Sequence, residues 1–353
     1  MTGEIKTVKT IIHSKDNPKN GEGAFLRLTD GGILYAYTKY DSNGSSIVAI
    51  RSYDEGETWS EPSEIISRDT HNASVSSVSL LRMQNGDIGI FYMVETTPGW
   101  VHHLVLARSS DEGVTFSKEV ANCSFELYDG YHMLSNDSVI RLSSGRIIVP
   151  ITYHTGNQKD TEGAHVDTCA YAGFSFSDDD GVTWHSSTDE IYQTFSNTKS
   201  GLQHGVVVEI APKSLKAFWT TDMMCAYESY STDDGNRWMA AQPARFSAPC
   251  SPINVTKNPA NGKIYAVWNP MPNYNGRAQD CVTLGRTPLV WAELDSSALV
   301  IKDIHVIEND ESKGYTSPSV FFCESGNMLV AYSCGGKDEG SCMADLKIVK
   351  IEL

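Results

Sequence analysis

The chain has 353 residues, with 28 Lys plus Arg against 44 Asp plus Glu, a formal net charge of −16 at pH 7. This acidic excess opposes non-specific electrostatic binding to nucleic acid or to an anionic membrane, so we expect neither as a partner. The eight cysteines show neither CxxC pairs nor His partners at zinc spacing, and we expect no metal and no cofactor.

The first 15 residues contain lysines but lack the apolar core of about 7 to 15 residues that a signal peptide needs. No later segment is apolar for long enough to span a bilayer. We therefore expect a cytoplasmic protein with reduced cysteines. A secreted protein whose leader had been removed would look the same.

From the N-terminus onward, the chain repeats one pattern of an apolar strand, a turn of the DG or SG type and a second apolar strand. The pattern starts six times, near Ala24, Val78, Ser138, Val206, Ile253 and Ser319. A third strand and an outer strand follow in each unit, which predicts four antiparallel strands per unit. No linker interrupts the series, so we expect one domain over residues 1–353.

Four units contain an eight-residue repeat, Ser-x-Asp-x-Gly-x-(Thr or a substitute)-aromatic. The copies are residues 52–59, 109–116, 177–184 and 231–238. Their aspartates are 57, 68 and 54 residues apart, the length of one propeller blade with its loops. The Asp is expected to accept hydrogen bonds from turn amides, while Gly supplies the turn conformation. The sequence thus predicts an all-β, six-bladed β-propeller in which the fifth copy has decayed.

The ends of the chain should close this ring. Residues 5–12 (IKTVKTII) can supply the outer strand of the blade that residues 344–353 (ADLKIVKIEL) finish. Pairing of the N- and C-terminal strands is therefore predicted.

The eight-residue repeat resembles the Asp box, or BNR repeat, of the sialidase superfamily, and residues 145–151 (GRIIVPI) resemble a stretch of the third sialidase blade. The resemblance covers essentially the whole chain. It implies a site at one end of the central channel, with the repeats on the opposite face. Sialidases hold the substrate carboxylate with three arginines, pair a Tyr nucleophile with a Glu, and use an Asp as general acid/base.

In the first blade, residues 21–24 (GEGA) lie where sialidases have Phe-Arg-Ile-Pro, which puts Glu22 in the position of the first arginine. Residues 36–41 (AYTKYD) resemble the segment leading to the catalytic Asp. The resemblance makes Asp41 the candidate general acid and Lys39 a candidate anion contact. A solvated turn explains Asp41 equally well, because Asp is common before such turns.

Polar residues also precede the inner strands of blades two and three. His71 and Asn72 stand before one, Asn136 and Asp137 before the other. Each is a candidate sugar contact, and Asp137 is a candidate catalytic carboxylate. Hydrogen bonding within their own turns would account for each of these residues equally well.

The remaining candidates come from blades four to six. Where the family often has Glu and then Arg, this chain has Gln203 and His204, and His204 is a candidate substrate contact. Residues 285–297 (GRTPLVWAELDSS) resemble the segment carrying the last arginine, which assigns Arg286. The nucleophile position falls on Ser317 or Pro318, with Tyr315 nearby as the candidate catalytic Tyr if the loop shifts.

These residues favour an exo-acting glycoside hydrolase that removes a terminal sugar, either sialic acid or a different acidic or neutral sugar. Glu22, Asp41 and Asp137 offer carboxylates for acid and base roles, because burial beside a second carboxylate would raise one pKa. The expected partner is a carbohydrate, with His154 as a further contact, and the oligomeric state is open. Trp219 and Trp268 could contact a sugar or belong to the core.

Two alternatives come from other classes. One is a carbohydrate-binding propeller without activity, favoured by the missing arginines and the displaced Tyr. The other is a polysaccharide lyase acting on a uronic acid, with Tyr153, His154 and His204 as acid and base and Arg286 on the carboxylate.

Overall fold

The strands are short and carry the β-branched and aromatic residues typical of antiparallel sheets. The computed structural model describes residues 3–68, 74–97, 101–117, 120–123, 131–157, 165–188, 190–191, 198–270, 282–298 and 300–353. In chain order the strands are β1 (Ile5–Ile11), β2 (Lys19–Arg27), β3 (Ile33–Asp41), β4 (Gly44–Ser52), β5 (Ser63–Ile66), β6 (Ser74–Arg82), β7 (Ile88–Thr97), β8 (Val101–Ser109), β9 (Ala121–Asn122), β10 (Tyr131–Met133), β11 (Ile140–Arg141), β12 (Ile147–Asn157), β13 (His165–Ser177), β14 (His185–Ser186), β15 (Gln203–Ala211), β16 (Ser214–Thr220), β17 (Cys225–Ser231), β18 (Gln242–Ser247), β19 (Asn254–Lys257), β20 (Ile264–Trp268), β21 (Leu289–Leu294), β22 (Ile301–Glu308), β23 (Lys313–Phe322), β24 (Met328–Gly336) and β25 (Asp345–Ile351).

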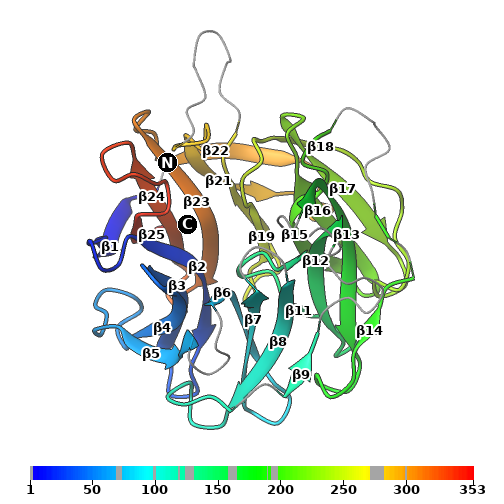
Figure 1. Ribbon diagram of the computed structural model, residues 1–353, viewed down its shortest axis with the longest axis horizontal. Helices are drawn as coiled ribbons and strands as arrows, with labels where there is room; N and C mark the ends of the chain where they lie inside the picture. Colours follow the sequence, from blue (N-terminus) through cyan, green and yellow to red (C-terminus); the bar gives the residue numbers. More distant parts are fainter. Residues whose placement is uncertain are drawn as a thin grey trace.

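Six groups of strands stand like blades around a common centre (Figure 1). From the inside outward, blade one is β2-β3-β4-β5, blade two β6-β7-β8-β9, blade three β11-β12-β13-β14, blade four β15-β16-β17-β18, blade five β19-β20-β21-β22 and blade six β23-β24-β25-β1. The predicted six-bladed β-propeller is confirmed. Within the described ranges there is no helix long and apolar enough to cross a membrane.

The first and last strands close the ring as predicted. β1 pairs antiparallel with β25, from Ile5 opposite Ile351 to Ile11 opposite Leu346. Blade six is therefore built from both ends of the sequence, and no turn joins its third strand to its fourth.

Blades two and three are less separate than the sequence suggests. β10 lies between them, antiparallel to β12 and bridged in parallel to β8 at Tyr131 and His102. The two blades therefore form one nine-stranded sheet. A short strand in this place pairs backbone groups that two diverging blades would otherwise leave unpaired.

The eight-residue repeats form the turns between third and fourth strands. In the first copy, Gly56 N donates to Ser52 Oγ at 2.9 Å and Thr58 N donates to Asp54 Oδ1 at 2.8 Å. Gly56 has a φ of 85°, a conformation that costs glycine little. The same Gly-to-Ser bond recurs in the other three copies. The expected turn chemistry is present.

The residue between Asp and Gly of the repeat ties neighbouring blades together. In each copy this residue is acidic and has a left-handed backbone conformation, with φ between 56° and 61°. Glu55 of blade one accepts a hydrogen bond from Ser325 N of blade six at 3.0 Å, and Glu112 of blade two accepts one from Thr29 N of blade one at 3.0 Å. The repeat thus stabilises the ring as well as its own turn.

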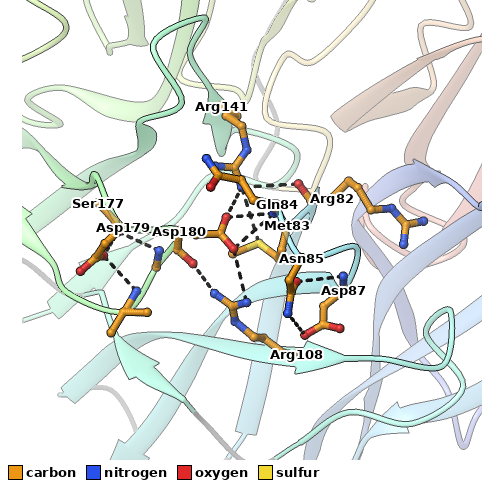
Figure 2. A network of polar contacts seen from close by, with 12 residues as sticks. Arg82, Met83, Gln84, Asn85, Asp87, Arg108, Arg141, Ser177, Asp179 and Asp180 are labelled. Carbon is orange, nitrogen blue, oxygen red and sulfur yellow. Dashed lines mark hydrogen bonds and ion pairs between the residues drawn. The ribbon is translucent and has the colours of Figure 1, made fainter.

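Asp180, the corresponding residue of blade three, lies between two arginines and a turn of blade two (Figure 2). Its Oδ1 accepts hydrogen bonds from Arg141 Nη2 at 2.6 Å and from Gln84 N at 3.1 Å. Arg108 approaches the other carboxylate oxygen at 3.5 Å and also donates to the Asp180 carbonyl. All three charged side chains are less than 20 % exposed, so little water replaces a lost partner.

Asp180→Asn is expected to lower the free energy of unfolding by about 2 to 3 kcal/mol, because two partly buried guanidinium groups lose their counter-ion. The matched control is Asp234→Asn. Asp234 has the same place in the repeat and a similar φ of 57°, but its Oδ1 has no partner among the described residues. Urea unfolding of both variants measures the effect. Equal losses would show that the Asp180 ion pairs contribute nothing.

Candidate active site at the centre of the ring

The inner strands of four blades share a β-bulge near their beginning. In each, two residues stand opposite one on the second strand, and the first of the two is left-handed with φ between 52° and 57°. These residues are Glu22, Ser77, His204 and Ser317. Non-glycine residues rarely adopt this conformation, and bulges concentrate next to functional sites because they redirect a side chain.

An aromatic residue supports each bulge from the second strand. The residues opposite the bulges are Tyr37, Tyr92, Trp219 and Tyr332, each at most 1 % exposed. Trp219 and Trp268 are therefore core residues and not sugar platforms. The packed rings hold the bulges in place and fix which side chains face the centre.

Glu22 forms the centre of a cluster of polar side chains. Tyr40 Oη donates a short hydrogen bond to Glu22 Oε2, and the Arg286 charge lies close enough to act on the same carboxyl. Burial nevertheless raises the pKa of Glu22 above its ordinary value. Burial and the neighbouring Glu22 together raise the pKa of Tyr40. Glu22 remains partly exposed, so a ligand can reach it.

Arg286 is positioned by contacts on both its backbone and its side chain. Its carbonyl accepts hydrogen bonds from Tyr315 N at 2.8 Å and Asn269 Nδ2 at 3.0 Å. Its Nη1 donates to Thr316 Oγ1 at 2.8 Å, and its Nη2 donates to the Cys250 carbonyl at 3.1 Å. The guanidinium is thus held in one place, with part of the residue exposed.

His204 of blade four lies near this arginine, and His154 of blade three lies near His204. His204 Nδ1 is 2.9 Å from Thr220 Oγ1, and burial together with the Arg286 charge lowers the pKa of His204 to about 3. His204 is therefore neutral at physiological pH. His154 Nε2 lies 3.3 Å from Gln203 Nε2, which brings the predicted contacts His154 and His204 to one place.

Asn136 and Asp137 cross the centre of the ring and form its floor. Asn136 Nδ2 donates to the Gly23 carbonyl of blade one at 2.9 Å. Asp137 Oδ2 accepts hydrogen bonds from Asn254 Nδ2 and Val320 N, both at 3.0 Å, from blades five and six. Burial raises the pKa of Asp137 to about 7, although both hydrogen bonds favour the charged form. Asp137 has a φ of 53° and is partly exposed.

Asp41 lies outside this cluster. Both of its carboxylate oxygens accept hydrogen bonds from Arg68 Nη1, and Oδ1 accepts another from Asn43 N at 2.7 Å. The Asn43 amide and Arg68 lower the pKa of Asp41, which does not suit a general acid. The solvated-turn interpretation of Asp41 fits these contacts. Lys39 lies on β3 opposite Asn20 and is partly exposed.

Tyr315 does not reach the cluster. Its ring is 1 % exposed and packs edge-on against Tyr332 at 6.0 Å, in the core between blades five and six. Burial raises the pKa of Tyr315 further. Tyr153 of the lyase hypothesis is likewise in the core, at 2 % exposure. Asn72 and His71 lie outside the described residues.

Sequence reasoning missed Tyr40, which is next to Asp41 in the chain. The two-residue period of a strand puts Tyr40 and Asp41 on opposite faces of β3. Register counted back from the turn at Gly31 would have placed Tyr40 opposite Asn20, whereas in the structure it lies opposite Lys19. The contact between Tyr40 and Glu22 depends on the bulge at Glu22. A bulge cannot be recognised from one sequence.

A family model described as "BNR repeat-like domain" matches residues 31–330. A solved structure from Dyadobacter fermentans, described as a protein of unknown function, has a TM-score of 0.72 and 16 % identity, covering 99 % of both chains. The NanB sialidase of Streptococcus pneumoniae has a TM-score of 0.69 and 13 % identity, covering 98 % of this chain and 70 % of its own.

The intramolecular trans-sialidase of Ruminococcus gnavus has a TM-score of 0.70 and 13 % identity, covering 99 % of this chain and 97 % of its own. No curated protein matches the sequence. At these identities the likeness to solved structures shows a shared fold.

Proposed function

Because the chain belongs to the family of BNR repeat-like domains and has the fold of sialidases, we propose that it is an exo-acting glycoside hydrolase that removes a terminal sugar from a glycan. The observation that carries the proposal is the contact between Tyr40 and Glu22 beside Arg286 at the centre of the ring. A partly buried tyrosine and glutamate facing a cation are the groups that this chemistry needs.

In this proposal Glu22 and Tyr40 react as a pair. Glu22 takes the hydroxyl proton of Tyr40 while Tyr40 Oη attacks the anomeric carbon, and the bond to the leaving group breaks as the leaving oxygen takes a proton from solvent water. Water then attacks the anomeric carbon and displaces Tyr40 Oη, releasing one proton to solvent, while the proton held by Glu22 returns to Tyr40 Oη. Ionised tyrosine is unfavourable here because burial raises its pKa, so proton transfer must accompany the attack.

The other residues of the cluster would bind the sugar. Arg286 offers a fixed positive charge, His204 is neutral, and both His204 and His154 can form hydrogen bonds. Asp137 on the floor would accept hydrogen bonds from sugar hydroxyl groups. Sialidases hold the substrate carboxylate with three arginines, and the sequence retains only the last of them, Arg286. This leaves both sialic acid and a different acidic or neutral sugar as substrates.

The test is release of methylumbelliferone from a panel of glycosides that includes the sialic-acid derivative, neutral sugars and uronic acids. An aryl leaving group needs little protonation, so the assay does not depend on the identity of a general acid. We expect turnover of at least one glycoside that Glu22→Gln abolishes. Turnover that persists in Glu22→Gln would contradict the catalytic roles given to Glu22 and Tyr40. Absence of turnover with every glycoside of the panel would contradict the proposed activity.

A carbohydrate-binding propeller without activity is the second candidate. It is favoured by Tyr315 and Asp41, since neither residue lies in the cluster around Glu22. Glycan binding that depends on Arg286, together with no turnover of any glycoside in the panel, would support a binding protein. The lyase hypothesis is weaker, because Tyr153 is buried in the core and the low pKa of His204 makes it a poor base.

A further inference from the structure

A cavity lies between blades five and six, at the far ends of the inner strands. Its volume is about 740 Å³, within the range of small-molecule sites. Arg27, at the end of β2, lines it, whereas Glu22 near the start of the same strand lies in the candidate active site. Five residues of strand separate the two, about 15 Å. The cavity is therefore a separate feature.

The cavity exists because blade six has no turn between its third and fourth strands. At other blade interfaces, the turn between the third and fourth strands contacts the inner-strand turn of the neighbouring blade. Glu55 binds Ser325 N in this way, and Glu112 binds Thr29 N. Blade six ends with β25 and takes its outer strand β1 from the start of the sequence, and Leu353 lines the cavity instead. The inner-strand turn of blade five is consequently left uncovered.

That turn satisfies its own backbone groups. Ala260 N donates to Asn258 Oδ1 at 2.9 Å, and Lys263 N donates to Asn261 Oδ1 at 2.9 Å. The turn therefore does not need a partner's acidic side chain, unlike the amides that Glu55 and Glu112 bind. Asn261 is exposed at the rim, where its Nδ2 can donate to a ligand.

Aromatic rings line the cavity. Tyr265 and Phe322 have ring centroids 5.2 Å apart, and Trp291 stacks on His305 at 4.3 Å. Trp291 is 7 % exposed, and its Nε1 has no hydrogen-bond partner within the described part of the chain. This N–H is closed off from the cavity, so Trp291 contributes its ring to the lining and no hydrogen-bond donor.

The charges at the cavity are largely paired. Lys263 Nζ lies 2.9 Å from Glu293, Lys302 also contacts Glu293, and Arg27 lies 3.4 Å from Glu324. The further carboxylate, Asp303, is exposed at the rim and disfavours an anion. An uncharged ligand with many hydroxyl groups suits this lining, since aromatic rings contact its apolar faces and the paired charges and amides bind its hydroxyls.

We propose that this cavity binds an uncharged oligosaccharide. The site is independent of the glycosidase reaction proposed above and would hold a glycan on the opposite face of the ring. Asn261 supplies a hydrogen-bond donor at the rim, and Tyr265, Trp291 and Phe322 supply the apolar lining.

Isothermal titration with neutral tetrasaccharides of glucose, galactose and mannose, and with an acidic uronic tetrasaccharide, tests the proposal. We expect at least one neutral tetrasaccharide to bind, and Asn261→Ala to weaken its binding by about fivefold or more. Asn85→Ala is the matched control, because Asn85 caps the corresponding turn of blade two through Asp87 N. It should leave binding unchanged.

The Glu22→Gln variant separates the two sites. Binding that persists in Glu22→Gln but falls in Asn261→Ala supports the cavity. Binding lost in Glu22→Gln but kept in Asn261→Ala would assign the glycan to the centre of the ring and overturn the proposal. Absence of binding by all neutral tetrasaccharides, or tighter binding of the acidic one, would also overturn it. Because Asn261 is exposed, its substitution should not disturb folding.

Discussion

Glu22→Gln is expected to lower kcat by at least about 100-fold on whichever glycoside the protein cleaves. Glutamine keeps the shape of the side chain and can still accept the hydrogen bond from Tyr40, but it cannot take the proton. Burial already raises the pKa of Glu22, so replacing the carboxyl by a neutral group should not weaken folding near neutral pH. A lost rate would then report chemistry and not unfolding.

The control for this variant is Glu64→Gln, which changes an exposed glutamate on β5 and should leave kcat within about twofold of the original. Tyr40→Phe then separates two roles for Glu22. If Tyr40 is the nucleophile, Tyr40→Phe is as inactive as Glu22→Gln. If Tyr40→Phe keeps a tenth or more of the activity, roughly a loss of 1.4 kcal/mol, Glu22 reacts directly and Tyr40 only positions it.

The fold could be predicted from the sequence because its signals are local and repeated. Asp54 and Gly56 make their turn with residues at most four positions away, and the same contacts return in each copy. Four equivalent turns at blade spacing permit few architectures. The link made by β10 was not predicted, because a three-residue strand carries almost no periodicity.

The candidate site was only partly predictable. Glu22, His204 and Arg286 were selected by their resemblance to sialidase positions, and the structure brings them together. Asp41 and Tyr315 were selected by resemblance, yet Arg68 pairs with the first and the core contains the second. Which side chains face the centre depends on a one-residue bulge, and each bulge depends on an aromatic residue packed from the next strand.

Asp137→Asn is expected to raise stability at pH 8. The pKa of Asp137 is about 7 in the folded protein against an ordinary value of 3.8, so the folded state binds this proton more tightly than the unfolded chain. Ionisation of Asp137 therefore lowers the free energy of unfolding as pH rises from about 4 to about 7, by up to about 4 kcal/mol in total. Above that range the effect is constant. Asparagine carries no charge to desolvate, and its Oδ1 can still accept one of the two hydrogen bonds.

Urea unfolding at pH 5 and pH 8 measures this effect. We expect Asp137→Asn to be more stable than the original by about 1 to 3 kcal/mol at pH 8, with a smaller difference at pH 5. Asp111→Asn should behave oppositely, because hydrogen bonds from Ser109 and Thr115 lower the pKa of Asp111 to about 2 and make its charge stabilising. If both variants lose stability at pH 8, the bonds from Asn254 and Val320 outweigh the burial of Asp137. If only Asp111→Asn loses stability at pH 8, the Asp137 carboxylate is retained at the floor of the ring at the expense of stability. This is expected for a residue kept for binding or catalysis.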